Sequence, residues 1–157
     1  MEIRGTGSYL PGKIITNDDL SEVVDTNDEW ISSRTGICQR HISEGETTSE
    51  MAARAAVVAL EDAEVSPEEV ELIIVATMTG DGAMPGTACK VQKEIGAVHA
   101  ACFDLSAACT GFVFALNTAN AYLASGMYRN ALVIGADMVS KVIDWTDRAT
   151  CVLFGDG

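Results

Sequence analysis

Basic residues are scarce in this chain of 157 residues. Ten lysines and arginines stand against 23 aspartates and glutamates, which gives a net charge of −13. A surface of that sign repels nucleic-acid phosphates and anionic lipid headgroups, so the sequence predicts no nucleic-acid partner and no membrane partner. Apolar residues make up 48% of the chain, and the excess of acidic groups is interpreted as a means of keeping such a protein soluble.

Metal ligands and paired cysteines are also lacking. The two histidines, His41 and His99, are too few for a metal cluster, so we expect no metal and no cofactor. The cysteine count is odd and no pair has CxxC spacing, which disfavours a disulfide framework or a zinc site and favours a reducing compartment. The five cysteines are Cys38, Cys89, Cys102, Cys109 and Cys151.

Signals for secretion or membrane insertion are missing as well. The first residues carry no basic cluster followed by a long apolar run, so no signal peptide is predicted. Asn117 and Asn120 interrupt the longest apolar helical stretch, so no segment is expected to span a membrane. A cytoplasmic location is therefore predicted.

Three apolar runs indicate strands that are buried on both faces, as in a parallel sheet covered by helices. They are 72–76, 101–105 and 131–135. Helical segments separate them, which predicts a β-α-β-α-β order and an α/β fold. The last apolar run, Cys151-Val-Leu-Phe154, is predicted to be a further strand, and Gly155-Asp-Gly157 the turn after it. A chain ending there suggests part of a longer protein.

Helix starts are marked by capping boxes, in which a hydroxyl precedes an acidic residue by three positions. Thr47 and Glu50 form one ahead of 51–60, Ser66 and Glu69 form another with Pro67 at the first helical position, and Thr26 and Glu29 form a third. The segment after Cys109 is apolar nearly all round, which predicts a central helix. Two glycine-rich segments, 5–10 and 80–86, depart from the dinucleotide-binding pattern and are interpreted as turns.

Cys109 is the strongest candidate for a nucleophile. It lies between a run of small residues and an apolar helix, so its sulfur is expected near the unpaired N–H groups of a helix N-terminus. The positive end of a helix dipole favours the reactive thiolate. The alternative is a cysteine that only fills space in the core.

A second candidate site combines a hydroxyl, an aromatic ring and a cation. Thr26, Trp30 and Arg34 are four residues apart, which places them on one helix face. Such a trio suits a nucleotide, with stacking for the base and a forked cation for phosphate. Spacing alone favours a cap, a core tryptophan and a solvated arginine. Arg148, in a loop after a strand, offers a second cation with the same ambiguity.

Taken together, these segments resemble the β-ketoacyl-acyl-carrier-protein synthase III family of thiolase-fold condensing enzymes. The matching segments are Gly5-Thr-Gly-Ser-Tyr-Leu-Pro11, Asp25-Thr-Asn-Asp-Glu-Trp-Ile-Ser-Ser-Arg-Thr-Gly36, Phe103-Asp-Leu-Ser-Ala-Ala-Cys-Thr-Gly-Phe112, and Asp147-Arg148 through Phe154-Gly-Asp-Gly157. The resemblance implies a mostly parallel mixed sheet, as the N-terminal half of a five-layered α-β-α-β-α architecture. Residues 1–157 would be that nucleophile-bearing half, with the C-terminal half absent from this chain.

The resemblance also implies an acyltransferase of type II fatty-acid biosynthesis. A short acyl-CoA such as acetyl-CoA, which is a substrate and not a cofactor, would acylate Cys109. Malonyl-acyl-carrier protein would then lose CO2 and attack the thioester. The catalytic histidine and asparagine are expected in the missing half, so this chain alone would not complete the condensation. A homodimer is also implied.

Individual residues take their expected roles from the same resemblance. Trp30 and Arg148 would sandwich the adenine of CoA, with Thr26 and Arg34 assisting at the nucleotide. Leu153 and Phe154 would line the channel or acyl pocket. Met84 stands where many relatives have a phenylalanine that closes the partner's acyl pocket, which predicts an altered primer preference.

Two other functions remain open at this point. The chain could come from another thiolase-fold condensing enzyme of polyketide type, or it could be a non-catalytic truncated binding module that pairs with a partner chain. A cysteine hydrolase is disfavoured, because neither histidine can be assigned as its base.

Overall fold

The structure is a computed structural model that describes residues 2–157. The chain divides into two compact units. One, here called the sheet unit, comprises the residues up to Tyr9 together with Thr47–Asp137. The other, the small unit, comprises Leu10–Glu46 and Met138–Gly157.

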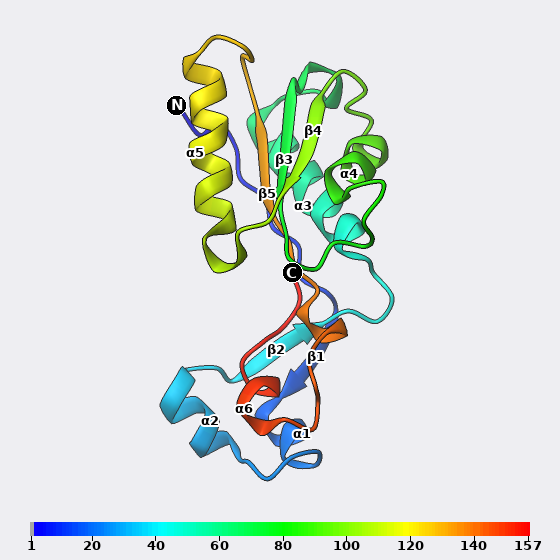
Figure 1. The fold of residues 1–157 in the computed structure, drawn as a ribbon. Coiled ribbons are helices and arrows are strands. Elements are labelled where there is room, and N and C mark those ends of the chain that lie inside the picture. Colours follow the sequence, from blue (N-terminus) through cyan, green and yellow to red (C-terminus); the bar gives the residue numbers. More distant parts are fainter. Residues whose placement is uncertain (1) are drawn as a thin grey trace. The chain divides into compact units, whose positions relative to one another are not determined.

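A three-stranded parallel sheet forms the centre of the sheet unit (Figure 1). β3 (Leu72–Ala76) lies in the middle, with β4 (Ala101–Leu105) on one side and β5 (Leu132–Gly135) on the other. Leu72 is opposite Ala101 in the first pair, and Ile73 is opposite Leu132 in the second. The three strands predicted from apolar runs are therefore confirmed, and all are parallel.

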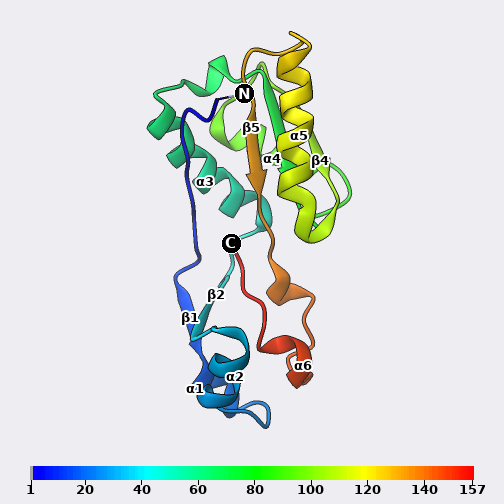
Figure 2. The same cartoon turned by 90° about the vertical axis from the view of Figure 1, so that its left-hand side faces the viewer.

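Helices cover both faces of this sheet (Figure 2). α3 (Thr48–Ala63) and α4 (Thr87–Ile95) pack on one face, and α5 (Gly111–Ala124) packs on the other. β3 serves both cores, because successive side chains of a strand point to opposite faces. Ile73 and Val75 join the core with α3 and α4, whereas Leu72, Ile74 and Ala76 join the core with α5.

The capping signals had different outcomes. Thr47 and Glu50 form the predicted capping box at the start of α3. The box at Ser66 opens only η1 (Pro67–Glu69), a single 3-10 turn. The third prediction was wrong in register, because the side chain of Asn27 and not that of Thr26 caps α2 (Asp28–Thr35). Asparagine and threonine are both good N-cap residues. Asn27 directly precedes the first helical residue, so its side-chain oxygen accepts a hydrogen bond from the Trp30 N–H.

The glycine segment 5–10 is not the predicted turn. It has no regular secondary structure and lies against α3. A Cβ atom built on Gly5 would come within 2.5 Å of the carbonyl oxygen of Ala59, and one on Gly7 would meet the backbone of Ala55 and Ala59. These glycines are therefore explained by a close backbone approach.

We expect Gly7→Ala to destabilise the sheet unit by about 1–3 kcal/mol, because the added methyl must displace helix backbone. Gly12→Ala is the matched control, since a Cβ on Gly12 meets no atom within 4 Å. Denaturant unfolding followed by far-UV circular dichroism measures both. Equal midpoints for the two variants would contradict the close approach.

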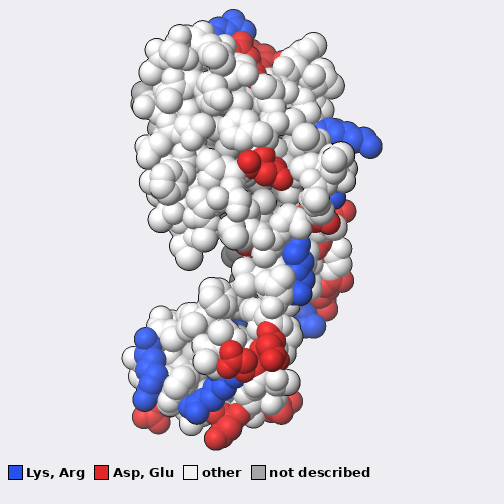
Figure 3. Space-filling view, in the orientation of Figure 1, with Lys and Arg blue, Asp and Glu red and all other residues white. Residues whose placement is uncertain are grey.

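One side of α5 packs on the sheet, and the other is exposed in this chain. Ala115 and Ala119 are buried, but Phe112, Val113 and Phe114 are 46%, 58% and 53% exposed. α5 contains no charged residue, and the surface over it is uncharged in Figure 3. The predicted central helix is thus buried on one face only.

The small unit is built on an antiparallel pair. β1 (Lys13–Thr16) pairs with β2 (Gln39–Ile42), and the helices are α1 (Asn17–Ser21), α2 and α6 (Arg148–Cys151). Leu20, Ile31, Cys151 and Val152 form its core. Besides η1, the described residues include the 3-10 turns η2 (Ala108–Thr110) and η3 (Val139–Lys141).

The strand predicted at 151–154 was wrong. Cys151 ends α6, and the following residues form a turn. The cause is Asp147, whose carboxylate accepts a hydrogen bond from the Ala149 N–H at 2.9 Å and starts a helix at Arg148. A four-residue apolar run is compatible with either a strand or a buried helical turn, and here the cap decides.

Candidate active site

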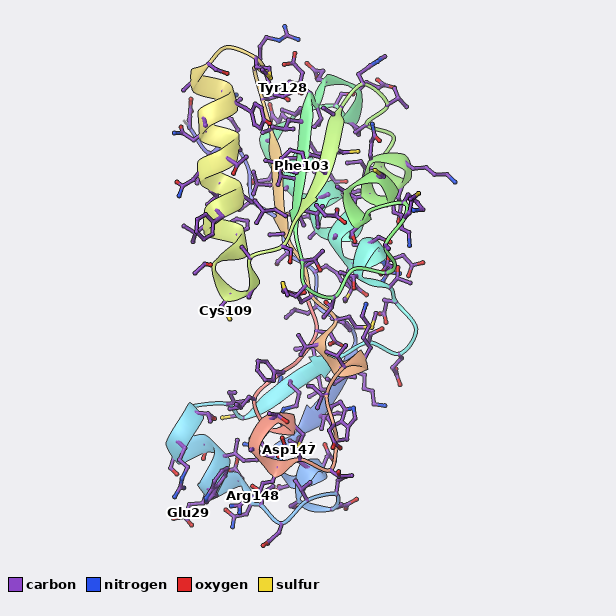
Figure 4. The ribbon with its side chains drawn as sticks, viewed as in Figure 1. Glu29, Phe103, Cys109, Tyr128, Asp147 and Arg148 are labelled. Carbon is purple, nitrogen blue, oxygen red and sulfur yellow. The ribbon has the colours of Figure 1, made fainter. Side chains whose placement is uncertain are left out.

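Cys109 lies in η2, between the end of β4 and the start of α5. Its side chain is exposed and projects outward from the tip of this turn (Figure 4). The preceding residue, Ala108, has a left-handed backbone with φ of 47°, which few residues other than glycine adopt. This sharp turn places the thiol at the surface directly before the helix instead of in the core.

A glycine allows the helix to begin so close to the sheet. A Cβ atom on Gly111, the first residue of α5, would lie 3.2 Å from the Cβ of Ala76 at the end of β3. Gly111, one of the small residues around Cys109, is therefore explained by the close packing of α5 on β3. The predicted position of Cys109 at a helix start is confirmed: the cysteine is the middle residue of a 3-10 turn that leads directly into the regular helix.

Hydrogen bonds hold the neighbouring loop after β3. One carboxylate oxygen of Asp137 accepts from the N–H groups of Met78 and Thr79, at 2.8 and 3.1 Å. The Ser106 hydroxyl, in the segment that leads to Cys109, lies 3.1 Å from the sulfur of Met78. Sequence reasoning missed Asp137, whose partners are some 60 residues earlier in the chain.

The small unit brings together three residues of the predicted nucleotide site. The guanidinium of Arg148 lies 4.1 Å from the centre of the Trp30 ring, and that of Arg34 lies 4.7 Å from it. Within residues 2–157, neither arginine forms an ion pair with a carboxylate. Two cations on one aromatic ring, without acidic partners, suit a ligand that has both a flat base and phosphates.

Two polar atoms of the predicted nucleotide-site residues have no partner among the described residues. The Oγ1 atom of Thr26 and the Nε atom of Arg148 are buried without a hydrogen bond in the described part of the chain. Buried polar groups are rarely left unpaired, and such atoms are expected where a ligand or water binds. Thr26 thus remains a candidate, although it lies outside α2 and is not on a helix face with Trp30.

Other expected site residues are exposed. Met84 is 91% exposed in the loop before α4, and Leu153 and Phe154 are each 42% exposed after α6. Cys109 and Met84 belong to the sheet unit. The small unit contains Leu153, Phe154 and the group formed by Trp30, Arg34 and Arg148, here called the Trp30 cluster. No group of three or more His, Cys, Asp or Glu side chains within the described residues could hold a metal ion.

No helix in the described part of the chain is long and apolar enough to cross a membrane.

Comparison with known proteins identifies the family. The sequence model of 3-oxoacyl-[acyl-carrier-protein (ACP)] synthase III matches residues 103–157, which include Cys109 and Arg148. The β-ketoacyl-[acyl-carrier-protein] synthase III of Clostridium acetobutylicum is 60% identical over all 157 residues. The chain belongs to the β-ketoacyl-[acyl-carrier-protein] synthase III family. It spans about half the length of the curated relatives it matches, 48% in the Clostridium protein.

Solved structures of similar proteins share the fold. The crystal structure of 3-oxoacyl-[acyl-carrier-protein] synthase III from Aquifex aeolicus superposes with a TM-score of 0.97 at 52% identity, covering 99% of this chain and 50% of that chain. The priming β-ketosynthase of the R1128 polyketide pathway gives a TM-score of 0.95 at 40% identity, with 99% and 47% covered. The expected thiolase-like α/β fold is confirmed. The resemblance implied a mostly parallel mixed sheet, and the three strands of the sheet unit are parallel throughout.

Proposed function

We propose that this chain provides the acylated nucleophile and the CoA nucleotide site of a β-ketoacyl-[acyl-carrier-protein] synthase III that initiates fatty-acid synthesis. The observation that carries the proposal is the exposed thiol of Cys109, placed by a sharp turn directly before α5. Homologues of that name at 55–60% identity support it. Residues 1–157 would be the N-terminal, nucleophile-bearing half of the enzyme.

The first half-reaction is a thioester exchange. The Cys109 thiolate attacks the carbonyl carbon of acetyl-CoA, the bond from that carbon to the CoA sulfur breaks, and CoA leaves as a thiolate that takes up a proton. N–H groups at the start of α5 would stabilise the negative oxygen of the tetrahedral intermediate. The carbanion from decarboxylated malonyl-acyl-carrier protein would then attack the acyl group, with histidine and asparagine supplied by the other half.

The direct test is acylation of the natural protein that carries this chain. After incubation with acetyl-CoA, peptide mapping by mass spectrometry should find one acetyl group, on Cys109. Acetylation of another residue, or none at all, would contradict the proposal. No metal or organic cofactor is added to this reaction, since the proposed chemistry needs only thiolate and thioester.

CoA binding should depend on the Trp30 cluster. We expect Trp30→Ala and Arg148→Ala each to raise the KM for acetyl-CoA about tenfold, because stacking and cation–π contacts are worth about 1–2 kcal/mol. Trp145→Phe is the matched control, an aromatic change in the same small unit. If the two variants lowered kcat and left KM unchanged, the assignment of a binding role would be wrong.

The position of Arg148 adds a condition to this binding mode. A base that stacks between two groups needs about 3.5 Å on each side, whereas the guanidinium lies only 4.1 Å from the ring centre. Arg148 must therefore move away from Trp30 if the adenine is to lie between them. Arg148 is the first residue of the four-residue helix α6.

Met84 is proposed to widen the choice of primer. Methionine is unbranched and adaptable, unlike the phenylalanine that the family resemblance implies for this position. In an acyl-CoA chain-length series, we expect primers longer than acetyl to be accepted, and Met84→Phe to lower the rate with the longest primers most. Acceptance of acetyl-CoA alone by the unmodified protein would refute this role.

A polyketide-type condensing enzyme is the second candidate. The likeness to the priming β-ketosynthase of the R1128 pathway favours it, although at a lower identity than the synthase III relatives. Primer and extender profiling distinguishes the two. The proposal also includes a homodimer and a cytoplasmic location, which size-exclusion chromatography with light scattering and cell fractionation would test.

A further inference from the structure

Two cysteines that the proposed reaction does not use are in contact in the sheet unit. Cys89 lies in the first turn of α4, Cys102 lies in β4, and their Sγ atoms are 3.5 Å apart. Cys89 is exposed and Cys102 is half-buried. No other cysteine pair among residues 2–157 makes a sulfur–sulfur contact. This is the one place in the described chain where two thiols are near bonding distance.

Hydrogen bonds on both sides of the pair hold α4 against β4. The Asp104 carboxylate accepts from the N–H groups of Thr87 and Ala88, at 2.7 and 2.6 Å. The Gln92 side chain donates to the carbonyl oxygen of Ala100 at 2.7 Å. These hydrogen bonds keep the two backbones, and with them the two thiols, side by side, and a disulfide requires the sulfur distance to shorten from 3.5 Å to roughly 2.05 Å.

We propose that Cys89 and Cys102 are a redox-sensitive pair, which a low-molecular-weight disulfide such as oxidised glutathione converts into an internal disulfide between α4 and β4. Cys89 loses its proton and attacks one sulfur of the small disulfide, whose S–S bond breaks and releases one thiolate. Cys102 then loses its proton and attacks the Cys89 sulfur, which releases the second thiolate. The two protein sulfurs give up two electrons, and the two released thiolates take up two protons.

The surroundings set this order of attack. Burial raises the pKa of the Cys102 thiol to about 11, with the hydrogen bond to Cys89 and the charges of Cys89 and Asp104 acting in the same direction. Cys102 therefore stays protonated near neutral pH and reacts second. Cys89 is exposed, so a small disulfide reaches it first.

The test treats the natural protein with oxidised glutathione, blocks the remaining thiols by alkylation, and maps the peptides by mass spectrometry. We expect a Cys89–Cys102 linked peptide, lighter by two hydrogens and reversed by dithiothreitol, about tenfold more abundant than any other cysteine pairing. In Cys102→Ser, the reaction should stop at a stable glutathione adduct on Cys89. Cys38→Ser, which changes an exposed cysteine of the small unit, should leave the link unaffected.

Three results with the unmodified protein would overturn the proposal. They are a glutathione adduct on Cys89 that persists beside a free Cys102, both cysteines remaining reduced, and either cysteine linked to a different partner. Acetylation of Cys109 is measured separately, so failure of the internal disulfide is distinguishable from failure of the proposed enzymatic function.

Discussion

Cys109→Ala should abolish acetylation of the protein by acetyl-CoA. Alanine keeps the size of the small-residue run but removes the sulfur that we propose forms the thioester, so no covalent intermediate should accumulate. We expect the rate of acetyl transfer to fall by about 10³-fold or more, which is typical when the nucleophile of a covalent mechanism is removed. Radiolabelled acetyl-CoA followed by protein precipitation measures the loss.

The control is another exposed cysteine. Cys38 lies after α2 in the small unit, and Cys38→Ala should leave acetylation at the level of the unmodified protein. Because Cys109 is exposed, its removal creates no cavity, and the thermal midpoint should stay unchanged. Acetyl transfer that survives Cys109→Ala would place the nucleophile elsewhere.

Arg40→Met should cause the largest loss of stability among single changes in the small unit. Arg40 is only 5% exposed, and its guanidinium donates to the carbonyl oxygens of Ile15 and Val152 and to the side-chain oxygen of Asn17. Burial lowers the pKa of Arg40, but an arginine stays protonated at any working pH. Methionine fills similar space and leaves three acceptors unpaired, at a cost of about 3–5 kcal/mol.

Denaturant unfolding measures this loss, with the fluorescence of Trp30 and Trp145 reporting on the small unit and far-UV circular dichroism on the whole chain. Arg129→Met is the matched control, because the Arg129 side chain is 86% exposed in its ion pair with Glu71. An exposed pair contributes less than about 1 kcal/mol. If Arg40→Met and Arg129→Met lost equal stability, the hydrogen bonds of the buried Arg40 guanidinium would not be what holds β1, α1 and the turn after α6 together.

The sequence predicted those elements in which one local pattern has one structural solution. The apolar runs at 72–76 and 101–105 are buried strands, and the capping box at Thr47 starts α3. The run at 151–154 failed because four apolar residues suit a strand or a helical turn equally, and the Asp147 side chain decides between them. The antiparallel pairing of β1 with β2 was not predicted, since neither segment has a distinctive pattern.

The candidate site shows the same division. Spacing within one helix placed Trp30 beside Arg34, which the structure confirms with a guanidinium–ring distance of 4.7 Å. Spacing could not bring Arg148 to the same ring, because 118 residues separate it from Trp30 and only the folded small unit joins them. The buried position of Arg40 was not predicted, because the neighbouring residues in the sequence do not distinguish a buried arginine from a solvated one.

Two of the three helices on the sheet carry a carboxylate at their N-terminus. The Asp81 carboxylate accepts from the N–H groups of Thr48 and Ser49 in α3, and Asp104 does the same for α4. Burial alone would raise the pKa of Asp81. Its hydrogen bonds with Ser49 and Thr48 and the nearby Lys90 together outweigh that effect, so the pKa is lowered overall and the carboxyl stays ionised.

The N-terminus of α5 has no such anion. It has no acidic residue in its first turn and no side-chain cap in the described structure. Two positive helix ends are thus neutralised by permanent carboxylates, and the third is left uncompensated directly after Cys109. In the proposed thioester exchange, the negative charge that develops beside Cys109 would meet this uncompensated helix end, whereas a permanent carboxylate there would repel it.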